Sequence, residues 1–231
     1  MTKIFLVIGH WSMVISSVEI LFRRRYARPM QGQFIVFEGP DGAGTTTHSV
    51  LLAETLKREG KPVLLTAEPT DGLIGRGIRE LLKVGGISGS ALQLLFCADR
   101  ADHQDAIEQA LERGDTVICD RYIPSTIAYG SALGLDVLWL RDVNRKFRTP
   151  DITFVLLPPL QVCIDRLKLR SSSDALEHDS LREHVYDAYQ RLAEADPLLT
   201  VIDTSESSKD VAKKIRVHIN LVPQPSGLQL L

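Results

Sequence analysis

Cysteine is scarce in this 231-residue chain, and no two cysteines have the spacing of a redox or zinc motif. The three cysteines, Cys97, Cys119 and Cys163, are odd in number and far apart. Such a set argues against a disulfide framework and fits a reduced, cytoplasmic setting better. We therefore expect a cytoplasmic protein that folds without disulfides and has no cysteine-based zinc site.

The chain also lacks an excess of either charge. It carries 27 basic and 29 acidic residues, for a net charge of −2 and a pI of about 6.3. A balanced charge gives no global field that would attract nucleic acid or a membrane surface, so we expect neither as a partner of the core domain. A length of 231 residues suits one α/β domain with a sizeable core.

Residues 1–30 lack an uninterrupted hydrophobic run. The segment Ile4–Phe22 is mostly apolar but contains Glu19 and several other polar residues, and arginines follow it. Its length allows a membrane anchor, although a central glutamate is costly in a bilayer. Its serines and arginines allow a targeting peptide. The third alternative is an extension outside the fold, with Met30 opening the domain. We expect a domain over 31–222 and a C-terminal tail over 223–231.

The most informative stretch is Phe34–Ser49, which reads FIVFEGPDGAGTTTHS. A short β-forming run, a glycine-rich turn and the start of an amphipathic segment follow one another, which is the layout of a phosphate-binding loop. Its pattern is G-x-x-x-x-G-K-[ST], but the lysine position holds threonine. An ordinary glycine-rich turn is the alternative. The candidate phosphate-binding residues are Gly39, Pro40, Asp41, Gly42, Ala43, Gly44, Thr45 and Thr46.

Five short apolar runs alternate with helical patterns along the rest of the chain. This alternation predicts an α/β fold of the P-loop NTPase type, with a five-stranded parallel sheet flanked by helices on both faces. The predicted strands are 34–37, 63–66, 116–119, 152–157 and 199–202. Ser90 is the expected N-cap of a long helix, and 72–77 is an expected turn before a short helix at 78–82. Ligands bind beyond the carboxyl ends of such strands.

Asp120 and Arg121 are both predicted at that edge of the sheet. Asp120 ends the third strand, where its carboxylate could hold Mg²⁺ together with the Thr46 hydroxyl. The alternative for Asp120 is a helix N-cap or a surface turn. Arg121 offers a planar cationic fork for a phosphate, and its alternative is a salt bridge with Asp120 or Glu68.

One face of the predicted long helix carries Phe96, Arg100 and His103 at helical spacing. An aromatic ring one turn from a guanidinium could stack on a base and bind its edge. From periodicity alone, Phe96 could equally belong to the core and Arg100 to its rim.

Three segments together resemble thymidylate kinases: the glycine loop, LLFCADRADH at 94–103 and DRYIPSTIAYG at 120–130. They occur in the order and at the separations found in that family, and the resemblance runs from Gln33 to Ile219. It implies transfer of the ATP γ-phosphoryl group to dTMP in the presence of Mg²⁺. Relatives are typically homodimers, so the resemblance also implies a homodimer.

The resemblance further assigns the residues around the nucleoside of dTMP. By analogy Phe96 would stack on thymine and Arg100 would bind its edge. Tyr129 would border the sugar and Ser125 would help to contact the base. Glu68 is a further candidate for the substrate site.

Around the phosphates, the resemblance implies that Arg121 holds the dTMP phosphate and that Asp120 works beside the metal. Asp41 would lie near the acceptor sugar and phosphate. Arg166 and Arg170, one turn apart, would introduce a lid at about 171–180. A closed lid excludes water that would otherwise hydrolyse ATP.

The chain departs from the family pattern in several places. Thr45 replaces the loop lysine, Ala67 stands where many relatives have arginine, and Gly130 stands where glutamine is common. The predicted lid has no basic residue, so a compensating arginine would be Arg166, Arg170 or Arg182. Two alternatives to an active thymidylate kinase therefore stay open: a kinase for another nucleoside monophosphate, and a nucleotide-binding paralogue that transfers no phosphate.

Overall fold

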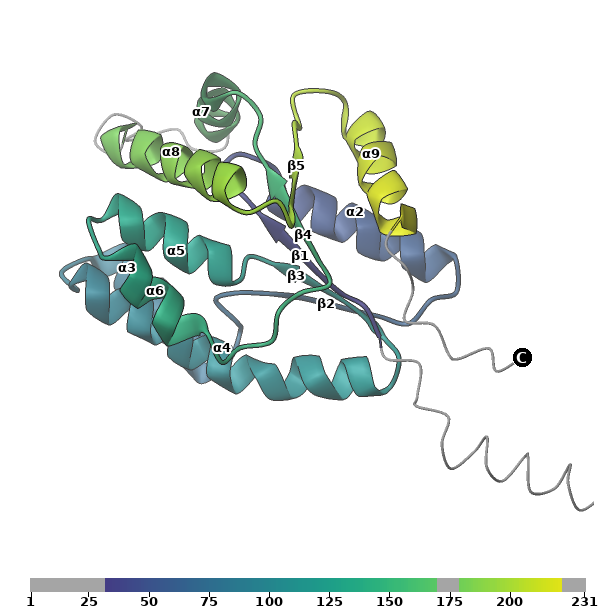
Figure 1. The fold of residues 1–231 in the computed structure, drawn as a ribbon, viewed down its shortest axis with the longest axis horizontal. Coiled ribbons are helices and arrows are strands. Elements are labelled where there is room, and N and C mark those ends of the chain that lie inside the picture. The colour runs from purple at the N-terminus through teal and green to yellow at the C-terminus, as the bar shows by residue number, and fades with distance from the viewer. Residues whose placement is uncertain (1–31, 170–178, 222–231) are drawn as a thin grey trace, which may run out of the picture.

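The structure is a computed structural model that describes residues 32–169 and 179–221. Its centre is one sheet of five parallel strands in the order β2-β3-β1-β4-β5 (Figure 1). The predicted α/β fold with a parallel sheet is confirmed. The strands are β1 (Phe34–Glu38), β2 (Val63–Ala67), β3 (Thr116–Asp120), β4 (Ile152–Leu156) and β5 (Leu199–Ile202).

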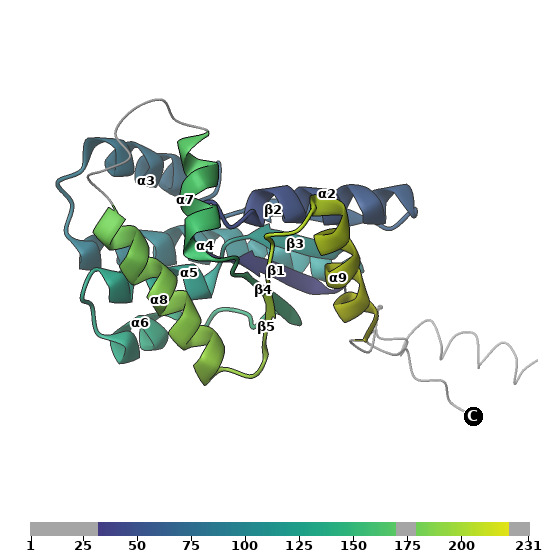
Figure 2. The same cartoon turned by 90° about the horizontal axis from the view of Figure 1, so that it is seen from above.

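Helices cover both faces of the sheet. Helices α2 and α9 lie on one face, and α4, α5 and α8 lie on the other (Figures 1 and 2). The helices of the described part are α2 (Thr45–Arg58), α3 (Leu73–Val84), α4 (Gly89–Glu112), α5 (Ile123–Ala132), α6 (Val137–Asn144), α7 (Leu160–Lys168), α8 (Asp179–Ala195) and α9 (Ser208–Leu221). Because all five strands are parallel, their carboxyl ends lie at one edge of the sheet.

Strand β1 is the centre of the core, because it is apolar on both sides. Phe34 and Val36 pack into the cluster that contains residues of α4, whereas Ile35 and Phe37 pack into the cluster of α2 and α9. All four side chains are 0% exposed. Burying side chains of this size stabilises the fold by about 1.5–3 kcal/mol each. The loop that follows β1 therefore begins from a strand that is buried on both faces.

Two local predictions were wrong. The N-cap of α4 is Ser88, whose hydroxyl oxygen accepts a hydrogen bond from the Ala91 amide at 3.3 Å, rather than Ser90. The expected turn at 72–77 is already helical, because α3 begins at Leu73. Gly75 does not break this helix. A Cβ there would lie 2.0 Å from the Thr70 carbonyl oxygen, so glycine allows α3 to pack against the preceding segment.

Several predictions concern residues outside the described part of the chain. These are the extension over 1–30, Arg170, nearly all of the lid at 171–180 and the tail at 223–231. Among the residues that the structure describes, no helix is long and apolar enough to cross a membrane.

Candidate active site

The glycine loop connects β1 to α2 and has the backbone of a phosphate cradle. Gly39 and Gly42 have φ angles of 152° and 85°, in a region that favours glycine. A Cβ at Gly39 would lie 2.4 Å from the Leu156 carbonyl oxygen, and one at Gly42 would lie 2.4 Å from that of Cys163. Both positions therefore require glycine.

The first turn of α2 is open to a ligand. Gly44 is its N-cap and supplies no side-chain cap, so the free N–H groups of that turn and the helix dipole favour an anion. A cavity of about 220 Å³ lies beside this turn, with Asp41, Gly42, Gly44, Thr45, Thr46, Thr47, Arg121 and Leu167 in its wall. The buried Thr45 occupies the lysine position. Within the part of the chain that the structure describes, Arg121 is the one basic residue in the wall of this cavity.

Arg166 supports the same loop from outside. Its Nη1 donates to the Gly42 carbonyl at 3.2 Å and to the Thr204 hydroxyl at 3.2 Å, and its Nη2 donates to the Thr204 carbonyl at 2.5 Å. The Thr204 hydroxyl donates to the Ala43 carbonyl at 2.7 Å. In this structure, then, Arg166 holds loop carbonyls, and a direct contact of Arg166 with phosphate stays a prediction.

Thr46 and Asp120 meet as predicted. The Thr46 hydroxyl donates to Asp120 Oδ2 at 2.5 Å, while the buried Asp120 Oδ1 has no hydrogen-bond partner among the described residues. A free carboxylate oxygen beside a hydroxyl fits Mg²⁺, which prefers oxygen ligands. The N-cap of α5 is Tyr122, which excludes the alternative in which Asp120 caps that helix. Thr46 and Asp120 also line a second cavity of about 290 Å³.

Arg121 directly follows β3 and reaches across to the glycine loop. Its Nη2 lies 2.5 Å from Asp41 Oδ1, and its Nη1 donates to the Gly39 carbonyl at 3.0 Å and to Ser125 Oγ at 3.3 Å. The salt bridge of Arg121 is therefore with Asp41, and the alternative salt bridges with Asp120 and Glu68 are not formed. The guanidinium also lies 5.4 Å from the centre of the Tyr129 ring.

Tyr129 and Asp41 together line a third cavity of about 130 Å³. Its remaining wall is largely apolar and comes from α7 and α8, with Arg182 on α8. Asp41 also lines the cavity at the glycine loop. The two residues predicted beside the acceptor sugar are therefore neighbours, and they adjoin the phosphate cradle.

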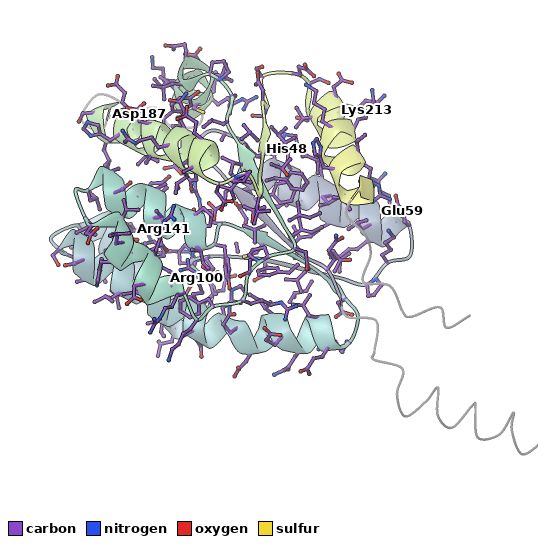
Figure 3. All side chains as sticks on the ribbon, viewed as in Figure 1. His48, Glu59, Arg100, Arg141, Asp187 and Lys213 are labelled. Atoms are coloured by element: carbon purple, nitrogen blue, oxygen red, sulfur yellow. The ribbon has the colours of Figure 1, made fainter. Side chains whose placement is uncertain are left out.

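Arg100 is buried inside the protein and is not a rim residue of the core. Its side chain is 1% exposed, and Figure 3 shows it among the side chains between α4 and the neighbouring elements. Its Nε donates to Glu68 Oε2 at 2.9 Å, and its Nη2 donates to Thr126 Oγ1 at 3.1 Å. Its Nη1 donates to Asn144 Oδ1. Phe96, one turn earlier on α4, is partly buried.

Other buried polar residues on α4 hold the segment after β2, and sequence reasoning missed their role. Asp99 accepts hydrogen bonds from the Thr70 amide at 2.7 Å and the Thr70 hydroxyl at 2.6 Å. The two ring nitrogens of His103 bind Glu68 Oε1 at 3.1 Å and Thr66 Oγ1 at 2.8 Å. These contacts fix Glu68 beside Arg100. The signal in the sequence for these contacts was a run of polar residues on one face of an otherwise packed helix.

A second missed group lies beneath Arg121. Glu38 is fully buried at the end of β1 and accepts hydrogen bonds from the Tyr122 amide, from Ser125 Oγ and from Tyr189 Oη. Burial raises the pKa of Glu38, and the hydrogen bond from Ser125 opposes that shift. Ser125 therefore points inward here, and its contact with a base stays a prediction. An acidic residue ending an apolar strand was the signal for Glu38.

Comparison with known proteins gives a consistent result. The sequence model of the family described as thymidylate kinase matches residues 37–215. A probable thymidylate kinase of Thermococcus kodakarensis is 42% identical over 193 residues, which cover 79% of this chain and 94% of that protein. One of Methanocaldococcus jannaschii is 35% identical over 195 residues, covering 84% and 99%. A thymidylate kinase of Thermomicrobium roseum is 42% identical over 177 residues, covering 71% and 82%.

Proposed function

The chain belongs to the thymidylate kinase family, and we propose that it transfers the γ-phosphoryl group of ATP to dTMP, giving dTDP and ADP. It is accordingly a nucleoside monophosphate kinase. The observation that carries this proposal is the meeting of three features at the carboxyl edge of the sheet. These are the open glycine loop, the pair of Thr46 with Asp120, and the Arg121 guanidinium.

The donor side of the site would consist of backbone N–H groups together with the side chains of Thr46 and Asp120. The N–H groups at the start of α2 would hold the phosphates of ATP, and the rigid loop presents them without rearrangement. Thr46 and Asp120 would hold Mg²⁺, which when bound neutralises charge on the phosphoryl oxygens. Phosphoryl transfer depends on in-line positioning and charge compensation more than on covalent catalysis, and these groups would contribute to both.

The acceptor side is built from side chains. Arg121 would exchange its ion pair with Asp41 for the dTMP phosphate, and Asp41 and Tyr129 would then border the sugar. Phe96 would stack on thymine while Arg100, held rigidly by Glu68, would bind the base edge. A planar guanidinium fixed in advance loses little conformational freedom when it binds.

The missing lysine leaves a charge to be compensated. A single well-placed cation at a transferring phosphoryl group can be worth about 10³–10⁵ in rate. We propose that Arg121, the basic residue that lines the loop cavity, supplies part of this charge. Arg166 could contribute only by exchanging its bonds to the loop carbonyls, and Arg182 lines the cavity next to Asp41.

Our proposal includes a domain over 31–222, a homodimeric assembly and a cytoplasmic location, with no nucleic-acid partner. The family match at 37–215 supports these domain bounds. Analytical ultracentrifugation of the full chain tests the assembly: a sedimentation coefficient of a monomer at micromolar concentration would contradict the homodimer.

The function is tested by measuring ADP release with Mg·ATP and, in turn, dTMP, dUMP, UMP, CMP and AMP. We expect dTMP to be turned over well above the other acceptors, and EDTA to abolish the reaction. A preference for UMP or CMP would leave the chemistry but assign a different substrate. Binding of dTMP in calorimetry without turnover of any acceptor would leave the nucleotide-binding paralogue.

A further inference from the structure

Glu38 is a carboxylate sealed inside the protein directly before the glycine loop. Its side chain is 0% exposed. Oε1 accepts the Tyr122 amide at 2.6 Å, and Oε2 accepts Ser125 Oγ at 2.6 Å and Tyr189 Oη at 2.9 Å. Burying a charge is costly unless donors surround it, and here three donors do so. Because burial of the Glu38 carboxylate is costly, we expect its three hydrogen bonds to serve a function.

One contact of Glu38 lies directly after the backbone of Arg121, at the Tyr122 amide. Arg121 has a φ of 70°, a left-handed conformation that is unfavourable for a residue with a Cβ. The amides on both sides of this strained Cα are held by β1. The Arg121 amide donates to the Phe37 carbonyl at 2.8 Å, and the next amide, that of Tyr122, donates to Glu38.

Glu38 also supports the Arg121 side chain. Ser125 donates its hydroxyl hydrogen to Glu38, which leaves the Ser125 oxygen to accept a hydrogen bond from Arg121 Nη1 at 3.3 Å. One buried carboxylate thus holds the amide that follows Arg121 and, through Ser125, supports one of the contacts of the Arg121 guanidinium, beside those with Asp41 and the Gly39 carbonyl.

Tyr189 connects this support to α8. Its fully buried hydroxyl lies 2.9 Å from both Ser125 Oγ and Glu38 Oε2. Its ring also meets Tyr129 edge-on, with ring centres 6.5 Å apart. Helix α8 therefore contributes one donor to the group that holds Arg121 and packs against the residue predicted beside the acceptor sugar.

We propose that Glu38 is a positioning residue for Arg121, and that together with Ser125 and Tyr189 it sets the affinity of the enzyme for the acceptor phosphate. This inference rests on the proposed function, because it takes Arg121 as the group that holds the dTMP phosphate. The hydrogen bonds of Glu38 run to α5, α8 and the turn after β3, away from the backbone that would bind ATP. Its loss should therefore affect the acceptor more than the donor.

The test compares Glu38→Gln, which keeps the shape but removes the charge, with the wild-type full chain. We expect the KM and the calorimetric Kd for dTMP to rise about tenfold or more, while the KM for ATP changes less than about twofold. Tyr189→Phe removes one donor and should raise the KM for dTMP by about threefold.

The matched control is Asp151→Asn, since Asp151 accepts a hydrogen bond from the Phe34 amide at 2.7 Å at the opposite end of β1. It should change thermal stability without changing the KM for dTMP.

The dependence on Arg121 separates positioning from a general effect on the fold. In an Arg121→Ala background, Glu38→Gln should cause no further loss of dTMP affinity. Equal loss of dTMP and ATP affinity, or full additivity with Arg121→Ala, would overturn the positioning role. Unchanged dTMP affinity in Glu38→Gln would overturn it as well.

The same measurements separate this inference from the proposed function. Wild-type protein that binds dTMP but transfers no phosphate would refute the proposed kinase activity. Calorimetric Kd values for dTMP in the Glu38 variants would then still test the positioning role of Glu38. A wild-type chain that binds no dTMP would overturn both.

Discussion

At the scale of single residues, the unusual feature is a threonine where the phosphate loop normally has its lysine. Thr45 is buried in the first turn of α2, and among the described residues the cavity beside it is lined by one cation, Arg121, which directly follows β3. We expect a site whose cation comes from that turn to be suited to phosphoryl transfer, because transfer depends on charge at the right point rather than on which element supplies it.

Restoring the lysine measures how much catalytic rate its absence costs. Thr45→Lys should raise kcat by about tenfold or more, since a cation at the β/γ-phosphates stabilises the charge that spreads over the transferred group. Thr45→Met has a side chain of similar length without charge and should give no gain. The measurement is steady-state ADP release with saturating dTMP. Equal rates for the two variants would mean that charge at this position is already fully compensated.

At the scale of elements, the glycine loop depends on close contact with α7. Gly42→Ala would place a Cβ 2.4 Å from the Cys163 carbonyl oxygen, at a φ of 85°. We expect a loss in unfolding free energy greater than the cost of the left-handed backbone alone, about 1–2 kcal/mol, and a clear rise in the KM for ATP.

Gly60→Ala is the matched control for the loop. Gly60 has a φ of 77° but no atom within 4 Å of the added Cβ. It should lose only the cost of the left-handed backbone, about 1–2 kcal/mol of unfolding free energy in urea, while keeping the KM for ATP. A raised KM in both variants, or in neither, would contradict the role assigned to the contact between Gly42 and Cys163.

The start of α4 gives a second prediction at this scale. Ser88→Ala removes the side-chain cap and should lower the free energy of unfolding by about 0.5–2 kcal/mol. Ser90→Ala should stay within about 0.5 kcal/mol of wild type. Urea denaturation monitored by circular dichroism decides between them, and a larger loss for Ser90→Ala would favour the cap inferred from sequence.

The elements and their order could be predicted from sequence because apolar runs and glycines are local signals. The pairing of Thr46 with Asp120 could also be predicted, since Asp120 ends one strand and Thr46 opens the helix after the loop that follows another. The support of Arg121 by Glu38 and Tyr189 could not. It joins residues 151 positions apart through buried hydroxyl groups, and no sequence periodicity records such a contact.

At the scale of the whole molecule, the face that carries α2 and α9 has a built-in dependence on pH. His48 is buried there between the two helices (Figure 3), and its Nδ1 has no hydrogen-bond partner among the described residues. Burial lowers the pKa of His48 below its ordinary value of 6.5, and the positive charge of Arg166 lowers it further. The folded protein therefore disfavours protonation at this position.

The consequence is a loss of stability in acid. Below about pH 6.5 the unfolded chain binds a proton that folded His48 excludes, so the free energy of unfolding should fall as the pH falls. His48→Gln should flatten this dependence between pH 7.5 and the lowered pKa. Urea denaturation at several pH values checks it. An unchanged slope in His48→Gln would contradict the assignment.

The most direct test of the account is transfer of labelled phosphate from [γ-³²P]ATP to dTMP by the full-length chain with Mg²⁺. We predict labelled dTDP from the wild type, and a loss of about 10³-fold or more in Arg121→Ala. Arg113→Ala, which removes an exposed arginine paired with Asp115, should retain wild-type activity. Absence of labelled dTDP from the wild type, or an Arg121→Ala variant as active as the wild type, would contradict the proposed site.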